Sequence, residues 1–368
     1  MSIASEAPDN AFFIGLMSGT SLDGVDGILT SLSGKQFAAY LPFPDDLKQA
    51  LMALQAPGEN EIHREALAAN QVAQLYAACV HALLQQAGIP ASAVKAIGAH
   101  GQTIRHLPAS GYTRQINNPA LLAELTGIDV VADFRSRDVA AGGQGAPLVP
   151  AFHQACFGSV TETRVVVNIG GISNISILKA DGTVSGFDTG PGNMLMDGWI
   201  HQHLGRDFDE DGQWAATGTV VPALLAAFMA EPFLQLPPPK STGRDLFHTQ
   251  WLANILASQP ALAPQDVQAT LTAFTALCIS DAISHYAAET AAVYVCGGGV
   301  RNTQLMTLLQ QALPMPVSST ETLGVAPGEV EALAFAWLAA RFCDRLPGNL
   351  PAVTGARGPR ILGALYPA

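Results

Sequence analysis

Two stretches of this sequence each combine an apolar run, a glycine-bearing polar loop and a second β-rich run. The first spans residues 12–30, with its loop at 18–24, and the second spans 164–178, with its loop at 170–173. Each pattern predicts a β-hairpin. Glycine lacks the Cβ that keeps other groups away from the backbone, so both loops could bring N–H groups close to a polyanion. For one such loop taken alone, a tight turn with solvated hydroxyls explains the pattern equally well.

The elements that follow the two hairpins come in a similar order. The first half predicts strands at 36–43, 96–100 and 128–134 and helices at 45–54, 60–88 and 118–127. The second half predicts strands at 164–169, 174–178, 184–187, 292–296 and 316–318 and helices at 193–204, 222–230, 266–288, 302–312 and 327–343. This repeat predicts two like α/β lobes with a cleft between them. A chain of 368 residues also exceeds the usual size of a single core.

Composition limits the partners and the compartment. A net charge of −12 argues against nucleic acid, which is usually bound by a basic face. No unbroken apolar run is long enough to span a bilayer, and the first ten residues lack the pattern of a secretory signal. The five cysteines are widely spaced, which indicates neither a disulfide framework nor a zinc site. We therefore expect a cytoplasmic protein with no membrane and no nucleic-acid partner.

Asp188 is the carboxylate with the most informative surroundings. It follows a predicted strand and precedes Thr189-Gly190-Pro191-Gly192-Asn193. Open α/β sheets bind ligands at the carboxyl ends of their strands, so Asp188 could act there as a general base. The structural alternative is an Asx-turn, or an N-cap for the next helix.

Other motifs carry weaker signals. Cys296-Gly297-Gly298-Gly299 follows a strand and precedes Asn302, so it could form a dinucleotide loop, a flat surface for adenine or ribose, or only a helix-entry turn. Arg135 could clamp a carboxylate or phosphate, or form an ion-paired hinge. Residues 207–212 resemble the start of a calcium loop, but position 218 holds glycine instead of glutamate, which favours an acidic surface loop.

Two polar hairpin loops and nearby carboxylates are typical of a nucleotide site with Mg²⁺. The sequence contains no G-x-x-x-x-G-K-[ST] motif. We therefore expect an ATP site that is not built on a P-loop.

Several motifs taken together resemble one family. They are Gly15-Leu16-Met17-Ser18-Gly19-Thr20-Ser21-Leu22-Asp23-Gly24-Val25-Asp26, Ala99-His100-Gly101-Gln102-Thr103, Asp133-Phe134-Arg135, Gly142-Gly143-Gln144-Gly145-Ala146-Pro147, Asn168-Ile169-Gly170-Gly171-Ile172-Ser173-Asn174, Asp188-Thr189-Gly190-Pro191-Gly192-Asn193 and Glu331-Ala332. This set resembles the anhydro-N-acetylmuramic acid kinases over nearly the whole chain.

The resemblance implies a duplicated ribonuclease H-like fold, as in actin, Hsp70 and hexokinase, with a central cleft. The first lobe would comprise 1–134 and about 325–368 and bind the sugar, and the second, 135–324, would lie on the adenosine side. The resemblance also implies a homodimer that uses ATP and Mg²⁺ to convert 1,6-anhydro-N-acetylmuramate and water into N-acetylmuramate 6-phosphate, in cell-wall recycling.

The expected site residues fall into three groups. Asp188 would activate water, and Asp23 would hold Mg²⁺. ATP would be bound by Gly19, Thr20, Ser21, Leu22, Asp23, Gly24, Val25, Asp26, Gly170, Gly171, Asn174, Gly190, Gly192, Asn193, Gly298, Gly299 and Asn302. The sugar would be bound by His100, Gln102, Thr103, Arg135 and Glu331, with Arg135 on its lactyl carboxylate or on the transferring phosphate.

Two other functional classes are compatible with parts of the sequence. An ATPase of the actin or Hsp70 type that regulates a protein partner would share the fold, but it should also need a peptide-binding domain or filament surfaces. The hypothesis of a nicotinamide oxidoreductase is supported only by the imperfect glycine-rich turn at 297–299.

Overall fold

Each half of the chain folds around its own mixed β-sheet. The computed structural model describes residues 11–19, 22–32, 34, 36–243 and 246–368. Unit 1 holds the described residues up to Cys156 and those from Glu329, and unit 2 spans Phe157–Gly328. Residues 135–156 therefore group with unit 1, whereas the sequence-based boundary lay at residue 134.

The sheet of unit 1 has six strands in the order β13-β7-β4-β1-β2-β3. Its strands are β1 (Phe12–Met17), β2 (Gly24–Thr30), β3 (Gln36–Pro42), β4 (Val94–Ala99), β7 (Val130–Ala132) and β13 (Ala364–Tyr366). Strands β1, β4 and β7 are parallel, and β2, β3 and β13 join antiparallel. A separate hairpin is formed by β5 (Gln102–Leu107) and β6 (Tyr112–Ile116).

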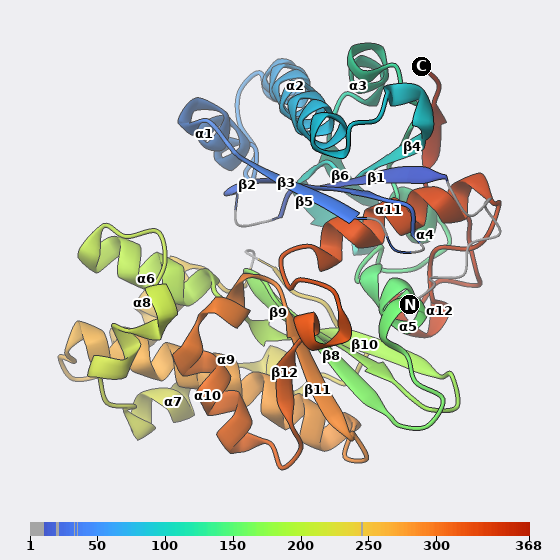
Figure 1. Cartoon of the computed structure of the whole chain (residues 1–368). Coiled ribbons are helices and arrows are strands. Elements are labelled where there is room, and N and C mark those ends of the chain that lie inside the picture. The colour runs from blue at the N-terminus through green and yellow to red at the C-terminus, as the bar shows by residue number, and fades with distance from the viewer. Residues whose placement is uncertain (1–10, 20–21, 33, 35, 244–245) are drawn as a thin grey trace. The chain divides into compact units, whose positions relative to one another are not determined.

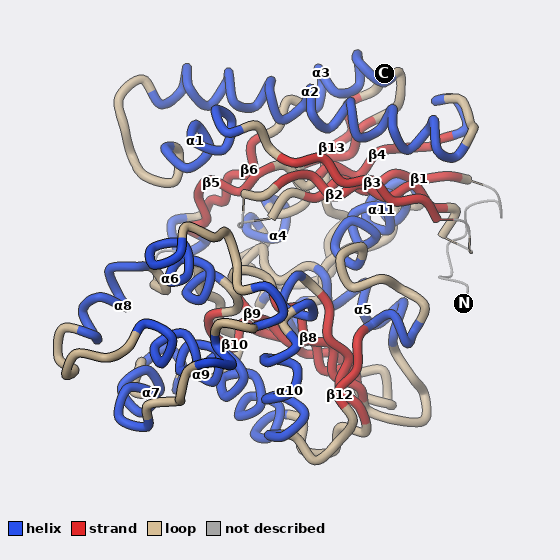
Figure 2. Tube along the Cα trace, turned by 60° about the vertical axis from the view of Figure 1, so that its left-hand side comes forward, coloured by secondary structure: helices blue, strands red, loops and turns tan. Residues whose placement is uncertain are grey.

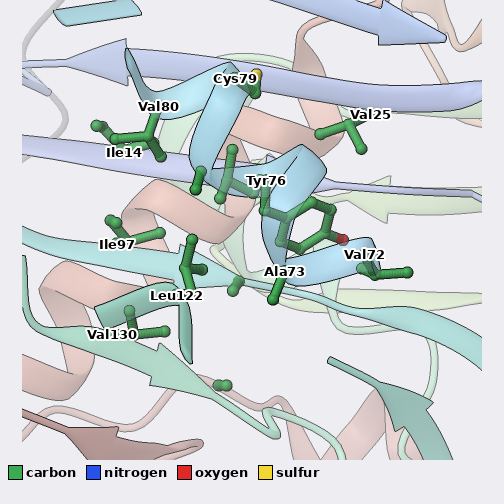
Figure 3. Packing of buried hydrophobic residues seen from close by; sticks show 14 of the residues in the cluster. Ile14, Val25, Val72, Ala73, Tyr76, Cys79, Val80, Ile97, Leu122 and Val130 are labelled. Carbon is green, nitrogen blue, oxygen red and sulfur yellow. The ribbon is translucent and has the colours of Figure 1, made fainter. Parts of the chain in front are cut away.

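Helices cover both faces of this sheet. They are α1 (Asp45–Ala53), α2 (Glu61–Ala87), α3 (Pro119–Thr126), α4 (Ser136–Ala140), α5 (Val149–Phe157), α11 (Val330–Cys343) and α12 (Pro351–Thr354). Helices α2 and α3 lie on one face and α11 on the other (Figure 1). Figure 3 shows Val72, Tyr76 and Val80 of α2 packed over Ile14 and Ile97 of the sheet, all buried in one core cluster.

Helix α11 lies unusually close to the sheet. A Cβ on Gly15 would overlap the carbonyl oxygen of Ala332, and one on Gly98 would overlap that of Phe335. These two glycines face each other on the parallel strands β1 and β4. The bare backbone therefore allows the small residues of α11 to pack directly on the strands, which explains why nearly the whole helix is buried.

The sheet of unit 2 has five strands in the order β10-β9-β8-β11-β12. They are β8 (Arg164–Ile169), β9 (Ile172–Leu178), β10 (Val184–Pro191), β11 (Ala292–Cys296) and β12 (Val317–Ser319). Its helices are α6 (Met194–Leu204), α7 (Pro222–Met229), α8 (Thr249–Leu256), α9 (Pro264–Tyr286) and α10 (Thr303–Ala312). Helix α9 contacts β9 and β10 and packs beside α10 over the second core cluster (Figure 2).

The strand order confirms the predicted duplication. In each unit the first three strands form an antiparallel meander, and the fourth and fifth join in parallel on the other side of the first. Such a repeated order of strands and crossover helices is the duplicated ribonuclease H-like arrangement expected from the sequence. Unit 1 adds β13 and the β5–β6 hairpin, which the sequence pattern did not predict.

Within the part of the chain that the structure describes, two helices, α2 and α9, are long and apolar enough to cross a membrane by length and composition alone. The most apolar windows of these helices are 44% and 78% buried, respectively, and both helices supply core residues to their units.

Candidate active site

At the carboxyl ends of the parallel strands of unit 1, three separate segments come together. Ser18 follows β1 and is buried, with its hydroxyl 2.9 Å from the Tyr76 hydroxyl and 3.2 Å from the carbonyl of Gly101. The Nε2 of Gln102 donates to the carbonyl of Gly19 at 3.1 Å. The first hairpin loop is thus held by side chains from α2 and β5.

The structure changes the roles open to the residues of this loop. Leu22 and Val25 were expected to bind nucleotide, but their side chains belong to the core, so they offer only backbone groups. Asp23 has an exposed side chain, and its carbonyl accepts from Phe43 N and from the Tyr40 hydroxyl, each at 3.0 Å. Gly24 and Asp26 lie on β2. Thr20 and Ser21 lie outside the described residues.

His100 and Arg135 form a pair at the same edge. Both Nε and Nη2 of Arg135 donate to Nε2 of His100, at 3.1 and 3.0 Å. Burial, followed by the nearby Arg135 charge, holds the pKa of His100 well below its usual value, so the imidazole is neutral. His100 therefore positions the guanidinium, whose Nη1 donates to the carbonyl of Gly145 at 2.8 Å.

A buried carboxylate that sequence reasoning passed over supports this pair. Asp138 is fully buried, and its carboxylate accepts from Gly145 N at 2.8 Å, Asn349 Nδ2 at 2.6 Å and Thr354 Oγ1 at 2.8 Å. It thereby fixes the loop whose carbonyl binds Arg135. Two aspartates and two arginines lie close together at 133–138, and the sequence did not indicate which carboxylate organises this segment.

The other two residues expected to bind the sugar are Thr103 and Glu331. Thr103 is half-buried on β5, where its hydroxyl accepts from Gln115 Nε2 at 3.2 Å. Glu331 lies half-buried in the first turn of α11.

The second hairpin loop, in unit 2, is held in a different way. Backbone N–H groups of residues 192–194 donate to the carbonyls of Gly170 and Gly171, at 2.8 to 3.2 Å. A Cβ on Gly192 would overlap the Gly170 carbonyl. Asn193 adds a bond from Nδ2 to the carbonyl of Ile169 at 3.3 Å. Main-chain hydrogen bonds therefore hold the loop against the start of α6.

Asp188 lies in a polar row that crosses the sheet of unit 2. Asn168 of β8 faces Asn174 of β9, which faces Asp188 of β10. Asn174 Oδ1 is buried and lacks a hydrogen-bond partner. The sequence placed Asp188 just after its strand, but β10 continues to Pro191, with an irregular register between Asp188 and Gly190. A bulge at this point lets the strand continue while redirecting the side chain.

A segment outside the predicted site also holds Asp188. Thr242 N donates to Asp188 Oδ2 at 2.9 Å, and Asp188 N donates to the carbonyl of Lys240 at 3.2 Å. Asp188 is 9% exposed. The sequence analysis assigned no site residue to this segment, although the hydroxyl and glycine residues Ser241, Thr242 and Gly243 were an available signal.

The glycine run after β11 divides into packed and open positions. A Cβ on Gly297 or Gly299 would overlap Asn168 or Ile169, whereas a Cβ on Gly298 would have its nearest neighbour, Asn193 Nδ2, at 3.7 Å. Asn302 caps α10 by accepting from Leu305 N at 2.9 Å. Gly190 packs against Cys278. Gly298 is therefore the position of this run that has space for a ligand.

The acidic stretch at 207–212 is not purely a surface loop. Asp209 is buried and accepts from Trp214 N and Ala215 N, at 2.8 and 2.9 Å. Across the described ranges, no group of three or more histidine, cysteine or acidic residues could hold a metal ion.

Comparison with known proteins decides the family. The family model described as anhydro-N-acetylmuramic acid kinase matches residues 11–368. The chain belongs to the anhydro-N-acetylmuramic acid kinase family.

Curated relatives agree with this membership over their whole length. The chain is 58% identical to an anhydro-N-acetylmuramic acid kinase of Paraburkholderia xenovorans, covering 99% of this chain and 100% of the relative. It is 60% identical to an anhydro-N-acetylmuramic acid kinase of Cupriavidus pinatubonensis, and the match covers 96% of this chain and 98% of the relative. Among solved structures, it is similar to the activator of the 2-hydroxyisocaproyl-CoA dehydratase from Clostridium difficile, with 11% sequence identity and a TM-score of 0.47. This match covers 91% of this chain and 96% of the activator chain.

Within this family member, the expected residues gather at the corresponding edge of each sheet. Unit 1 brings together Gly19, His100, Gln102 and Arg135. Unit 2 brings together Gly170, Asn174, Asp188, Gly192 and Asn193.

Proposed function

We propose that this chain opens the 1,6-anhydro ring of anhydro-N-acetylmuramic acid with water and phosphorylates the freed O6 with ATP. Membership of the family supports the kinase activity, the sugar substrate and the use of ATP. The products are N-acetylmuramate 6-phosphate and ADP, which suits a place in cell-wall recycling.

The observation that carries the chemistry is the setting of Asp188. It lies at the bulge of β10 beside the buried Asn174 amide, and one of its oxygens is fixed by the Thr242 N–H. Asp188 accepts a proton from water as the water oxygen bonds to the anomeric carbon. The bond from that carbon to O6 breaks, and O6 takes its electron pair and attacks the γ-phosphorus. ADP leaves with the electrons of the broken phosphorus–oxygen bond.

Arg135 supplies the fixed positive charge for an anionic group of the ligands. Because His100 is neutral and accepts two of its N–H groups, the guanidinium keeps its charge and a set orientation. Its planar fork suits the lactyl carboxylate or the transferring phosphate. Gln102 and Thr103 on β5, and Glu331, complete the proposed sugar contacts.

The phosphates of ATP are assigned to backbone groups of residues 19–26 and 170–174, and the adenosine to the open face at Gly298. Mg²⁺ prefers one or two carboxylates together with phosphate and water, and the exposed carboxyl of Asp23 fits this preference. Bound with ATP, the ion would neutralise negative charge on the phosphates. A cytoplasmic homodimer completes the proposal.

Isotope labelling tests the reaction directly. The protein is incubated with the anhydro sugar, ATP and Mg²⁺ in ¹⁸O-water, and the product is analysed by mass spectrometry. The proposal predicts one ¹⁸O atom at the anomeric hydroxyl and none in the phosphate group. Label found in the phosphate, or an unlabelled sugar product, contradicts coupled ring opening and transfer.

A further inference from the structure

The carboxylate of Asp188 is held from the edge of β10 by the segment 240–242. Two hydrogen bonds connect them: Thr242 N donates to the side-chain oxygen Oδ2 of Asp188, and Asp188 N donates to the Lys240 carbonyl. Strand β10 is the edge strand of its sheet on this side. The segment therefore contacts this edge strand at Asp188, and it supplies the N–H group that binds the carboxylate.

The side chain of Lys240 anchors this segment. Its Nζ donates to the carbonyls of Leu234 and Phe233, at 3.0 and 3.3 Å. The ammonium also lies over the rings of Phe233 and Phe187, 4.9 and 5.8 Å from their centroids. Two carbonyls and two aromatic rings thus hold a single cation, and one of these rings, that of Phe187, belongs to the strand that carries Asp188.

The charge of Lys240 is stabilised by groups of its own unit. Burial lowers its pKa, while the nearby Cys278 and Asp188 favour the charged form. At least two of its three N–H donors are used by main-chain carbonyls of its own unit. These bonds indicate that the residue acts on the protein itself.

We propose that Lys240 is a positioning residue for Asp188, which it places by fixing the segment whose Thr242 N–H binds the carboxylate. This inference rests on the proposed function, in which Asp188 accepts the proton of water. A displaced carboxylate would still leave the nucleotide and sugar contacts of the chain intact. Loss of Lys240 therefore affects turnover and not substrate binding.

Steady-state kinetics on the full-length protein test the inference, with anhydro-N-acetylmuramic acid, ATP and Mg²⁺. Lys240→Met keeps an unbranched side chain but removes the charge and the two hydrogen bonds. Its kcat should fall about 10- to 100-fold, because a small misplacement of a reacting group lowers the rate to this degree. The KM values for ATP and for the sugar should stay within about twofold of those of the natural protein. Lys240→Arg retains the charge and donors and should restore most of kcat. Lys179→Met, at a half-exposed lysine of the same unit that pairs with Glu289, is the control.

A second pair of variants tests the same contact without touching the lysine. Thr242→Pro removes the N–H donor and should lower kcat to a similar degree, whereas Thr242→Ala keeps the N–H and should behave like the natural protein. This pair decides the inference if Lys240→Met does not fold.

The outcomes separate the inference from the proposed function. Loss of turnover in Asp188→Asn together with unchanged kcat in Lys240→Met and Thr242→Pro overturns the positioning role and leaves the function in place. Retained turnover in Asp188→Asn overturns the function and the inference with it. Equal losses in Lys240→Met and Lys240→Arg, with raised KM values, show a general structural defect and also overturn the positioning role.

Discussion

The hairpin loops of the two sheets follow the same strand order but are secured by different kinds of contact. In unit 1, side chains that come from distant segments, Gln102 and Tyr40, bind the loop carbonyls of Gly19 and Asp23. In unit 2, main-chain N–H groups of residues 192–194 bind the carbonyls of Gly170 and Gly171.

The row of residues behind each loop differs as well. Across the first three strands, unit 1 pairs Met17 with Asp26 and Asp26 with Tyr40. Unit 2 pairs Asn168 with Asn174 and Asn174 with Asp188. A repeated fold thus carries its proposed base in one copy, while the loop of the other copy is bound by side chains whose replacement should loosen it. The predictions below test this division of roles.

The largest effect is expected from Asp188→Asn. The amide keeps the size of the side chain but cannot accept the proton of water, so product formation should fall at least about 100-fold, in the range of lost general-base catalysis. ATP binding, measured by calorimetry, should persist. Asp181→Asn, in an exposed turn of the same unit, is the isosteric control. Turnover like that of the natural protein in Asp188→Asn removes the base from unit 2.

Gly192→Ala tests the main-chain attachment of the second loop. The new Cβ would overlap the carbonyl of Gly170, so the free energy of unfolding should fall by about 1–3 kcal/mol. Urea denaturation measures the change. Gly170→Ala is the matched control, because its Cβ would lie 3.6 Å from the nearest carbonyl oxygen. Equal stability of the two variants contradicts the tight contact.

Acid should weaken unit 1 before unit 2. Among the described residues, the buried histidines are His100 and His153, both in unit 1, and burial lowers the pKa of each, that of His153 to about 3. Below about pH 6.5 the unfolded chain binds protons that these native side chains do not. As the pH is lowered from about 6.5, the free energy of unfolding should therefore fall by up to about 1.4 kcal/mol per pH unit for each histidine.

Hydrogen exchange at pH 7 and pH 5, corrected for intrinsic rates, measures this difference between the units. His153→Phe should reduce the pH dependence of unit 1, and His81→Gln, at an exposed position, should not. Parallel loss of protection in both units speaks against the histidines as the cause.

The smallest effect is expected from Gln102→Ala. It removes the donor to the Gly19 carbonyl, a contact of about 1 kcal/mol, so KM for ATP should rise about fivefold while kcat changes little. Gln49→Ala, at an exposed position of α1, serves as control. An unchanged KM would mean that the first loop does not depend on this side chain.

The sequence predicted best what depends on neighbouring residues. Asn118 caps α3 by accepting from Leu121 N, Pro119 begins the helix and Gly127 ends it with a φ of +64°, in agreement with the helix predicted at 118–127. Asn60 shows the limit of this reasoning, since it precedes α2 with a φ of +51° and without a side-chain cap. Local chemistry indicates where a helix begins more reliably than how its first turn is capped.

Contacts between distant segments could not be read from the sequence. The bulge that redirects Asp188, its bond to Thr242 and the Asp138 network with Asn349 and Thr354 join residues that are far apart along the chain. Strand β13 pairs with β7 across more than two hundred residues. Each depends on which strands become neighbours, which residue patterns alone do not specify.

The placement of α11 also has a consequence for synthesis on the ribosome. Proteins emerge N-terminus first, and unit 2 is one continuous segment that ends before this helix begins. The glycine-lined side of the β1–β4 sheet stays uncovered until residues 330–343 have been translated. Although all its strands except β13 are made first, the N-terminal unit is therefore the last to be completed.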